Sequence, residues 1–266
     1  MEQAELIVLD TIDLVWAYGL ILLTFGLARL QKVGQEKQFL WASVRMVAQL
    51  LAIGYTLHLV FAIRSPLPVL LILLVMAGFS VQVMAGRVKG KMPGFYKVVG
   101  VAILVGCGLV SFYFCLVVVG FTPWYDPRYL IPLVGMIIGN SMNGASLAAE
   151  RLHSELAERK DEIETALCLG ASARQASQEA MRSAFRAALI PATNTMAAMG
   201  IVSLPGMMTG QILSGTEPVV AVKYQIAIMC AITGAVAITT FLIVHRGYRA
   251  YFSRAHQLLD LSAPRS

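Results

Sequence analysis

A charged segment divides an otherwise apolar chain: residues 150–190 read ERLHSELAERKDEIETALCLGASARQASQEAMRSAFRAALI. The segment holds seven acidic and six basic residues, and its apolar residues recur at helical spacing. Gly170 then allows a tight backbone that other residues resist, and Ser172 with Gln175 is typical of a capping box at a helix start. The pattern predicts a short helix, a bend, and a second helix that ends near Pro191.

The composition of the whole chain is that of a membrane protein. Of its 266 residues, 58% are hydrophobic and 14% are charged, against about 25% charged residues in soluble domains, and the mean hydropathy is +0.71. The first residues are acidic and lack the basic start of a secretory signal, so the first apolar run is read as a retained span. Four scattered cysteines predict neither a disulfide framework nor structural zinc.

Seven apolar runs are long enough to cross a bilayer, which takes about 20 residues. They cover residues 11–30, 40–63, 66–86, 98–121, 129–148, 191–213 and 224–245. The fold class predicted from them is all-α: a polytopic transmembrane helical bundle of about seven spans, forming one membrane domain over residues 1–266, with residues 150–190 as a cytoplasmic insertion.

Basic residues alternate between the two sides of these spans. Seventeen of the 21 lie on one side and three on the other, while Arg45 falls within a span. By the positive-inside rule the richer side is cytoplasmic. We therefore expect a multi-pass protein of the inner (plasma) membrane, with its N-terminus outside and its C-terminus in the cytoplasm. The net charge of +6 then reflects topology and attraction to anionic lipid, and requires no nucleic-acid partner.

A bent amphipathic segment on the cytoplasmic side has two interpretations. A short helix held at an angle can dock in a groove of a soluble partner. Alternatively, the segment is a charged helical hairpin that lies on the membrane surface.

The residues around the bend resemble a known motif. Glu164, Ala166 and Gly170 are spaced as in the EAA-x-x-x-G loop of ABC transporter permeases, with Thr165 in place of the first Ala. A wider likeness runs through roughly residues 12–255. It rests on Arg45-x-x-x-Gln49-Leu50, Pro132-Leu133-x-Gly135-Met136-x-x-Gly139-Asn140-Ser141-Met142, Glu164-x-x-Leu167-x-Leu169-Gly170-Ala171 and Gly200-Ile201-Val202-x-Leu204-Pro205-Gly206-Met207-Met208-Thr209-Gly210. Together these strings resemble the FetB (YbbM) family of ABC permeases, which is linked to iron export and is similar to plant aluminium-tolerance permeases.

That resemblance implies a permease subunit that exports iron or a metal-related cargo. It implies a separate cytoplasmic ABC ATPase that carries the ATP and magnesium, a permease homodimer, and no cofactor on this chain. The residues that would couple to the ATPase are Glu164, Ala166, Leu167, Gly170 and Ala171.

Polar residues inside the spans are candidates for a transport pathway. Arg45 and Gln49 share a helix face, where they line a pathway, reach the lipid headgroups, or join helices by hydrogen bonds. Asn140 and Asn143 also share a face, which favours a cavity-lining role.

The run 191–213 is the least regular of the spans. Pro205 removes a backbone donor and Gly206 adds freedom, so a kinked or interrupted helix is expected there. Discontinuous helices often form transporter binding sites, which adds Asn194, Thr209 and Gln211 to the pathway candidates. The competing interpretation is a hinge at Pro205 and Gly206 without substrate contact.

The sequence offers no metal site of its own. Thirteen methionines suit soft ions such as Cu(I), but methionine is also ordinary core filling. No Asp or Glu lies in spans two to seven, so a dehydrated divalent cation would lack anionic ligands. A chelated or organic cargo fits the neutral amides at least as well.

The chain is not predicted to be an enzyme. Residues 86–92 are one residue short of a Walker A motif and lack its Ser or Thr, so ATP hydrolysis belongs to a partner. Two other classes stay open. One is a gradient-driven transporter, which would normally need a titratable carboxylate in the membrane. The other is a non-transporting assembly or sensor subunit.

Overall fold

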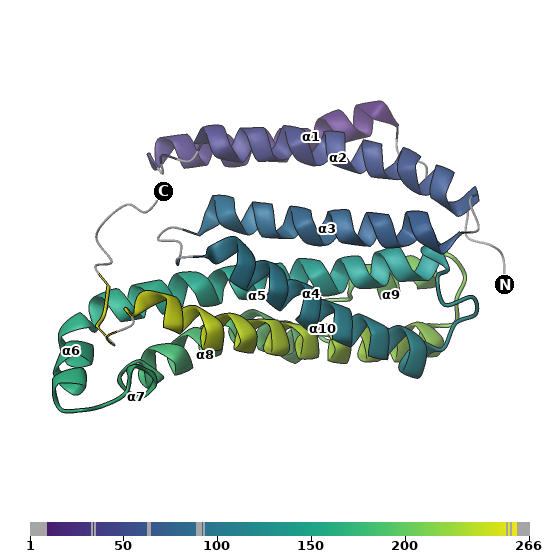
Figure 1. Cartoon of the computed structure of the whole chain (residues 1–266). Helices are drawn as coiled ribbons and strands as arrows, with labels where there is room; N and C mark the ends of the chain where they lie inside the picture. The colour runs from purple at the N-terminus through teal and green to yellow at the C-terminus, as the bar shows by residue number, and fades with distance from the viewer. Residues whose placement is uncertain are drawn as a thin grey trace. The chain divides into compact units, whose positions relative to one another are not determined.

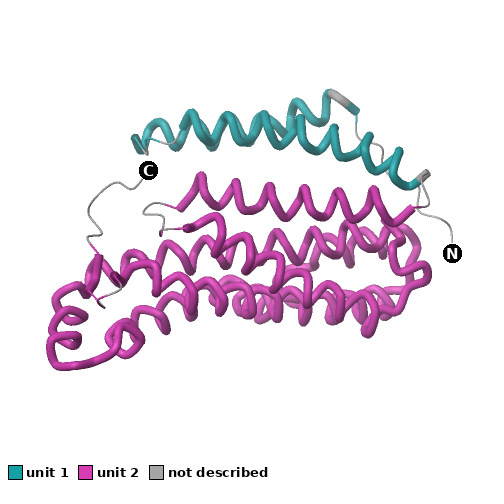
Figure 2. Tube along the Cα trace, viewed as in Figure 1, with its two compact units in different colours: residues 1–64 teal, residues 65–266 magenta. Residues whose placement is uncertain are grey.

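The computed structural model describes residues 10–32, 34, 36–62, 65–88, 92, 94–253, 255 and 257–259, without the side chains of Thr11 and Ala62. The chain divides into two compact units, Met1–Arg64 and Ser65–Ser266 (Figure 2). Throughout the described residues the structure is helical apart from turns and two isolated β-bridges. The predicted all-α membrane bundle is confirmed, and the assignment of residues 1–266 to one permease domain stays a prediction.

The first unit is a pair of helices, α1 (Thr11–Leu30) and α2 (Glu36–Ala62). A hydrogen bond of 2.8 Å between the hydroxyls of Tyr18 and Ser43 joins them. Most of their apolar side chains are exposed; Trp16, for example, is 77% accessible. Surfaces of this kind are stable where lipid rather than water covers them.

The second unit contains the remaining elements (Figure 1). They are α3 (Pro66–Arg87), α4 (Phe95–Tyr113), the π-helical turn η1 (Phe114–Val119), α5 (Pro127–Glu158), α6 (Lys160–Cys168), α7 (Ala173–Ala176), α8 (Gln178–Ala198), α9 (Gly206–Leu213), α10 (Pro218–Gly247) and the 3₁₀ turn η2 (Tyr248–Tyr251).

Six helical segments of the described chain are long and apolar enough to cross a membrane. They are Ile12–Leu30, Glu36–Phe61, Pro66–Arg87, Phe95–Val119, Pro127–Glu158 and Pro218–Tyr251. They correspond to the predicted spans 11–30, 40–63, 66–86, 98–121, 129–148 and 224–245. The remaining predicted span, 191–213, is not a single helix: α8 ends at Ala198, and Pro205 is the N-cap of α9. The expected interruption at Pro205 and Gly206 is thereby confirmed.

The predicted helix boundary near Pro191 is wrong. Helix α8 runs without a break from Gln178 to Ala198 and holds Pro191 in its interior. A proline inside a helix removes one backbone hydrogen-bond donor. Ending the helix at this point would leave several backbone polar groups without partners, which costs more where neighbouring helices pack around it.

Helices α5, α8 and α10 form the centre of this unit. Gly144 of α5 lies beside Ala188 of α8 and Thr240 of α10. Nearer one end of the bundle, Leu152 of α5 approaches Gly247 of α10. Helices α5 and α10 therefore run in the same direction, and residues 178–217 return the chain between them. A broken run, α8 with α9, replaces the continuous span expected there.

The contact between α4 and α10 gives a stability prediction. A Cβ on Gly106 would lie 3.0 Å from the backbone nitrogen of Thr239, whereas one on Gly108 would meet nothing within 4 Å. We expect Gly106→Ala to lower the free energy of unfolding by about 1–3 kcal/mol, since the helices must separate. Gly108→Ala should be neutral or stabilising by up to about 1 kcal/mol. Thermal unfolding of the purified variants in detergent measures both, and equal melting temperatures would contradict this packing.

Candidate functional site

The charged segment forms a bent projection at one end of the second unit, and we name residues 159–177 the elbow. Helix α5 has 32 residues and is therefore about 48 Å long, whereas the hydrocarbon core of a bilayer is about 30 Å thick. Its last turns extend beyond that core and carry α6 and α7 with them, at the end where α8 begins (Figure 1).

The bend at Gly170 is a Schellman motif that ends α6. Gly170 has a φ of +93°, and its N–H donates to the carbonyl of Leu167 at 3.0 Å. The N–H of Ala171 donates to the carbonyl of Ala166, also at 3.0 Å. These two bonds define the motif and favour glycine at this position, so the left-handed backbone predicted for Gly170 is confirmed.

A new helix begins immediately after the bend. The backbone N–H of Ser172 donates to Oε1 of Gln175 at 2.9 Å, and the N–H of Gln175 points back to Oγ of Ser172. The predicted capping box is therefore present, and it fixes the start of α7.

The predicted coupling residues surround this bend. Glu164 is exposed and lies 3.8 Å from Nζ of Lys160, a weak pair at the surface. Ala166, Leu167 and Ala171 are half-buried. The exposed large apolar residue of the elbow is Leu169, with 84% of its surface accessible.

Buried residues hold the elbow against the bundle. Ile163 is 2% exposed, and Ala173 is 8% exposed. Ser177 is fully buried, and its hydroxyl donates to the carbonyl of Ala173 at 2.7 Å. The elbow is therefore anchored at both of its helices, while the tip between them is exposed.

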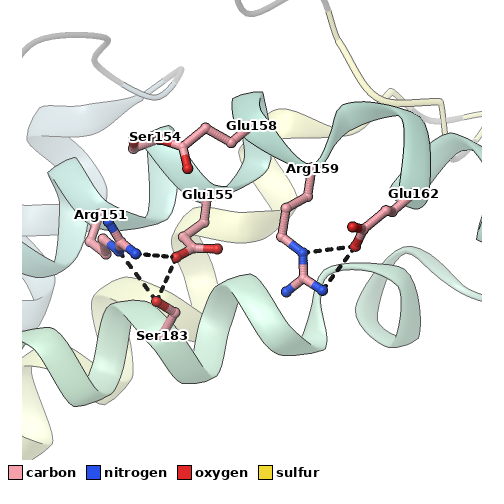
Figure 3. Close-up of polar contacts among 7 residues, drawn as sticks. All are labelled: Arg151, Ser154, Glu155, Glu158, Arg159, Glu162 and Ser183. Atoms are coloured by element: carbon pink, nitrogen blue, oxygen red, sulfur yellow. Dashed lines mark hydrogen bonds and ion pairs between the residues drawn. The ribbon is translucent and has the colours of Figure 1, made fainter.

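A polar cluster, which we name the clip, ties α5 to α8 just beyond the elbow (Figure 3). Nη2 of Arg151 lies 2.6 Å from Oε1 of Glu155. The hydroxyl of Ser183 on α8 donates to the same oxygen at 2.7 Å and accepts from Nε of Arg151 at 3.3 Å. Because the Glu155 side chain is 10% exposed, these bonds are poorly screened by water. Arg159 and Glu162 form a second pair at the junction of α5 and α6, with Nη2 and Oε2 2.8 Å apart.

A cavity of about 220 Å³ lies among α5, α8, the break after α8, and α10. Its lining residues are Asn140, Asn143, Gly144, Ala188, Pro191, Ala192, Thr195, Met199, Pro205, Gln225, Met229, Ile232 and Val236. Among the residues that the structure describes, no charged side chain lines it. The structure thus brings Asn140 and Asn143 together with the predicted break at Pro205.

Several polar side chains that line this cavity direct a donor at the protein itself. Nδ2 of Asn140 donates to the carbonyl of Met136 at 2.8 Å, and the hydroxyl of Thr195 donates to the carbonyl of Pro191 at 2.9 Å. Nε2 of Gln225 faces the sulfur of Met199 at 3.9 Å, a weak contact. Gln225 is 7% exposed, and its Oε1 is buried with no partner among the described residues. An acceptor of this kind suits a ligand that donates hydrogen bonds or carries positive charge.

Other predicted pathway residues lie elsewhere, and their roles stay predictions. Asn194 is exposed on α8, while Thr209 and Gln211 belong to α9, and none of the three lines the cavity. Arg45 and Gln49 lie on α2 in the first unit, where both residues are exposed. Their roles in transport therefore rest on the sequence pattern.

Two residues gain importance only from the structure. The family likeness includes Leu169, but the predicted coupling residues do not. An apolar residue beside the glycine of a polar loop is a sequence signal that could have added it to them. Gln225 was missed, although it stands as a lone amide within the apolar run of α10. The sequence alone does not show which side of α10 the side chain of Gln225 faces.

The predicted orientation rests partly on residues that lie outside the described part of the chain. They are Arg64, Lys89, Lys91, Arg254 and Arg265. Within the described part of the chain, no group of three or more His, Cys, Asp or Glu side chains is placed to hold a metal ion.

Comparison with known proteins places the chain in a family. The profile of the uncharacterised protein family UPF0014 matches residues 11–252. A UPF0014 membrane protein of Synechocystis is 40% identical over 259 residues, covering 97% of this chain and 100% of the relative. No solved structure shows a significant match.

Two further relatives bear functional names. The probable iron export permease protein FetB of Escherichia coli is 31% identical over 247 residues, 93% of this chain and 94% of its own. The protein ALUMINUM SENSITIVE 3 of Arabidopsis thaliana is 31% identical over 245 residues, 91% of this chain and 87% of its own. The likeness seen in the sequence motifs is confirmed, and the chain belongs to the UPF0014 family of multi-pass membrane proteins.

Proposed function

We propose that the chain is the permease subunit of an ABC transporter that exports iron or a metal-related cargo. A separate cytoplasmic ATPase drives it, and two copies of the chain pair in the inner membrane, with the N-terminus outside and the C-terminus in the cytoplasm. The family supports this proposal, because a relative that matches along nearly its whole length is named an iron export permease.

The observation that carries the proposal is the exposed tip of the elbow. An apolar side chain that is 84% accessible on a loop of charged helices is costly in water and fits the pocket of a soluble partner. Acidic residues in the first turn of α6 and the anchored base of the elbow hold this side chain in a defined position.

The clip provides a route from the elbow to the cavity. Arg151 and Glu155 bind Ser183 of α8, and Pro191 of the same helix lines the cavity, about two helical turns further on. Force applied to the elbow would therefore reach α8 through a partly buried polar contact and act at the wall of the cavity.

The cavity itself restricts the cargo. It presents acceptor oxygens and thioether sulfurs but no carboxylate, so a bare divalent cation would lose its hydration without gaining anionic ligands. A metal held in a chelate that donates hydrogen bonds satisfies Oε1 of Gln225 without that cost. At about 220 Å³, the cavity in this conformation admits only a small cargo or part of a larger one.

The docking role of the elbow predicts a loss of partner binding in Leu169→Ser. Removing a central apolar anchor should lower capture of an ABC ATPase at least about tenfold, with an unchanged melting temperature because Leu169 is 84% exposed. Co-purification of the tagged chain from its native membranes, with quantitative mass spectrometry of ATPase-domain proteins, measures this. Ile201→Ser is the matched control, since Ile201 is 92% exposed but lies beyond the far end of α8. Equal capture by all three proteins would contradict a docking role for the elbow.

The cavity predicts opposite effects of Gln225→Leu on stability and on transport. Leucine removes a buried carbonyl without a partner, so the melting temperature should stay constant or rise. ATP-dependent accumulation of chelated iron in inverted vesicles that contain the ATPase should fall about tenfold, the effect of one lost hydrogen bond to the cargo.

The matched control for this variant is Thr240→Val. Oγ1 of Thr240, on the same helix, is also buried with no partner among the described residues, but Thr240 does not line the cavity, so transport should persist. A lower melting temperature in Gln225→Leu, or equal transport losses in both variants, would rule out cargo binding by Gln225.

A further inference from the structure

A second groove lies between α7, α8 and α10, apart from both the elbow tip and the cavity. Its volume is about 390 Å³, and its lining residues are Arg174, Gln175, Gln178, Met181, Arg182, Phe185, Phe241, Val244 and His245. Basic and amide side chains are combined there with four apolar ones, and no acidic residue of the described part of the chain lines the groove.

The polar part of this groove carries positive charge. No acidic side chain within the described chain pairs with Arg174. Arg182 has a long contact, 3.7 Å, from its Nη1 to Oε2 of Glu179, and both side chains are mostly exposed. Such a pair is weak, so the guanidinium of Arg182 can still bind an anion. Two arginines at one groove match the geometry of a phosphate group.

The apolar part of the groove is built from Met181, Phe185, Phe241 and Val244. His245 stacks on Phe241, with the ring centroids 3.9 Å apart. Its Nδ1 lies 3.1 Å from the carbonyl of Phe241, which leaves Nε2 for a ligand. A soluble phosphate would use the arginines but leave this apolar wall uncovered.

The sequence around the groove is typical of the level at which a helical bundle leaves the hydrocarbon. The apolar run of α10 ends at Val244, and His245 and Arg246 follow it. Helix α8 is charged from Glu179 to Arg186 and becomes apolar after that residue. Both helices therefore change between polar and apolar sequence beside this groove, as helices do where lipid headgroups meet acyl chains.

We propose that this groove binds an anionic phospholipid from the leaflet on the side of the elbow. The phosphate contacts Arg174 and Arg182, and an acyl chain covers Phe185 and Phe241. Because Arg174 belongs to α7 while Arg182 belongs to α8, the bound lipid links the elbow to the membrane-spanning helices. The inference does not depend on the ATPase or on the cargo.

The test uses the full-length protein in nanodiscs of phosphatidylcholine with increasing phosphatidylglycerol, at physiological ionic strength. Native mass spectrometry counts the retained phosphatidylglycerol, and the melting temperature reports its stabilising effect. Arg174→Gln and Arg182→Gln should each weaken the apparent affinity about fivefold, the effect of one arginine at an anionic surface. Arg186→Gln is the matched control, because this exposed arginine lies on α8 but does not line the groove. All variants should melt like the parent in pure phosphatidylcholine.

Three outcomes would overturn the proposal. Equal losses in Arg186→Gln and the groove variants would show general attraction to a charged surface. Equal stabilisation by inorganic phosphate or by short-chain phosphatidylglycerol would show a site for a phosphate group alone. Protection of Arg174 and Arg182 from arginine-modifying reagents by the bound ATPase, but not by phosphatidylglycerol, would assign the groove to a protein partner.

Discussion

The close contact of α5, α8 and α10 at Gly144 determines how the rest of the second unit is arranged. A side chain at this position would meet Cγ1 of Val236 at 2.7 Å and the carbonyl of Ala188 at 3.4 Å. Within a bilayer, helices gain little from hydrophobic burial against one another, so direct van der Waals contact decides their association. The missing side chain of Gly144 therefore helps to set the position of α8 along its two neighbours. In that position Ser183 lies opposite Glu155, and Thr195 and Asn140 line the same cavity.

The break after α8 follows from the same packing. Residues Met199 to Pro205 leave the helix, and Gly200 adopts a φ of +86°. Local bonds satisfy part of the freed backbone, including one of 2.9 Å from the N–H of Gly200 to the carbonyl of Ser203. Irregular backbone at this depth is stable only where protein or a watery cavity meets it. The cavity beside Met199 and Pro205 meets this requirement, so the break and the cavity depend on each other.

The sequence predicted the features that arise from local chemistry. Gly170, Ser172 and Pro205 each act through their own backbone or through a neighbour a few residues away, and the structure confirms all three. The features it could not predict depend on the direction of a side chain around its helix. Asn194 and Thr195 are adjacent and differ by about 100° around α8, yet only Thr195 reaches the cavity. The continuation of α8 through Pro191 likewise depends on α5 and α10, which a local pattern does not contain.

A glycine at a bend can act as a hinge, but the structure around Gly170 argues for a rigid bend. Two backbone bonds close the Schellman motif around it, the capping box fixes the next helix, and buried Ile163 and Ala173 hold both sides. The clip then joins α5 to α8, so the elbow and the first turns of α8 move as one body. The segment from Met199 to Pro205 belongs to no helix and most of its residues are exposed, so the bonds that hold it are short-range ones within the segment and to the end of α8. In the proposed transport cycle, a displacement of the elbow would therefore be absorbed at this break, directly beside the carbonyl of Gln225, and not at the bend where the displacement begins.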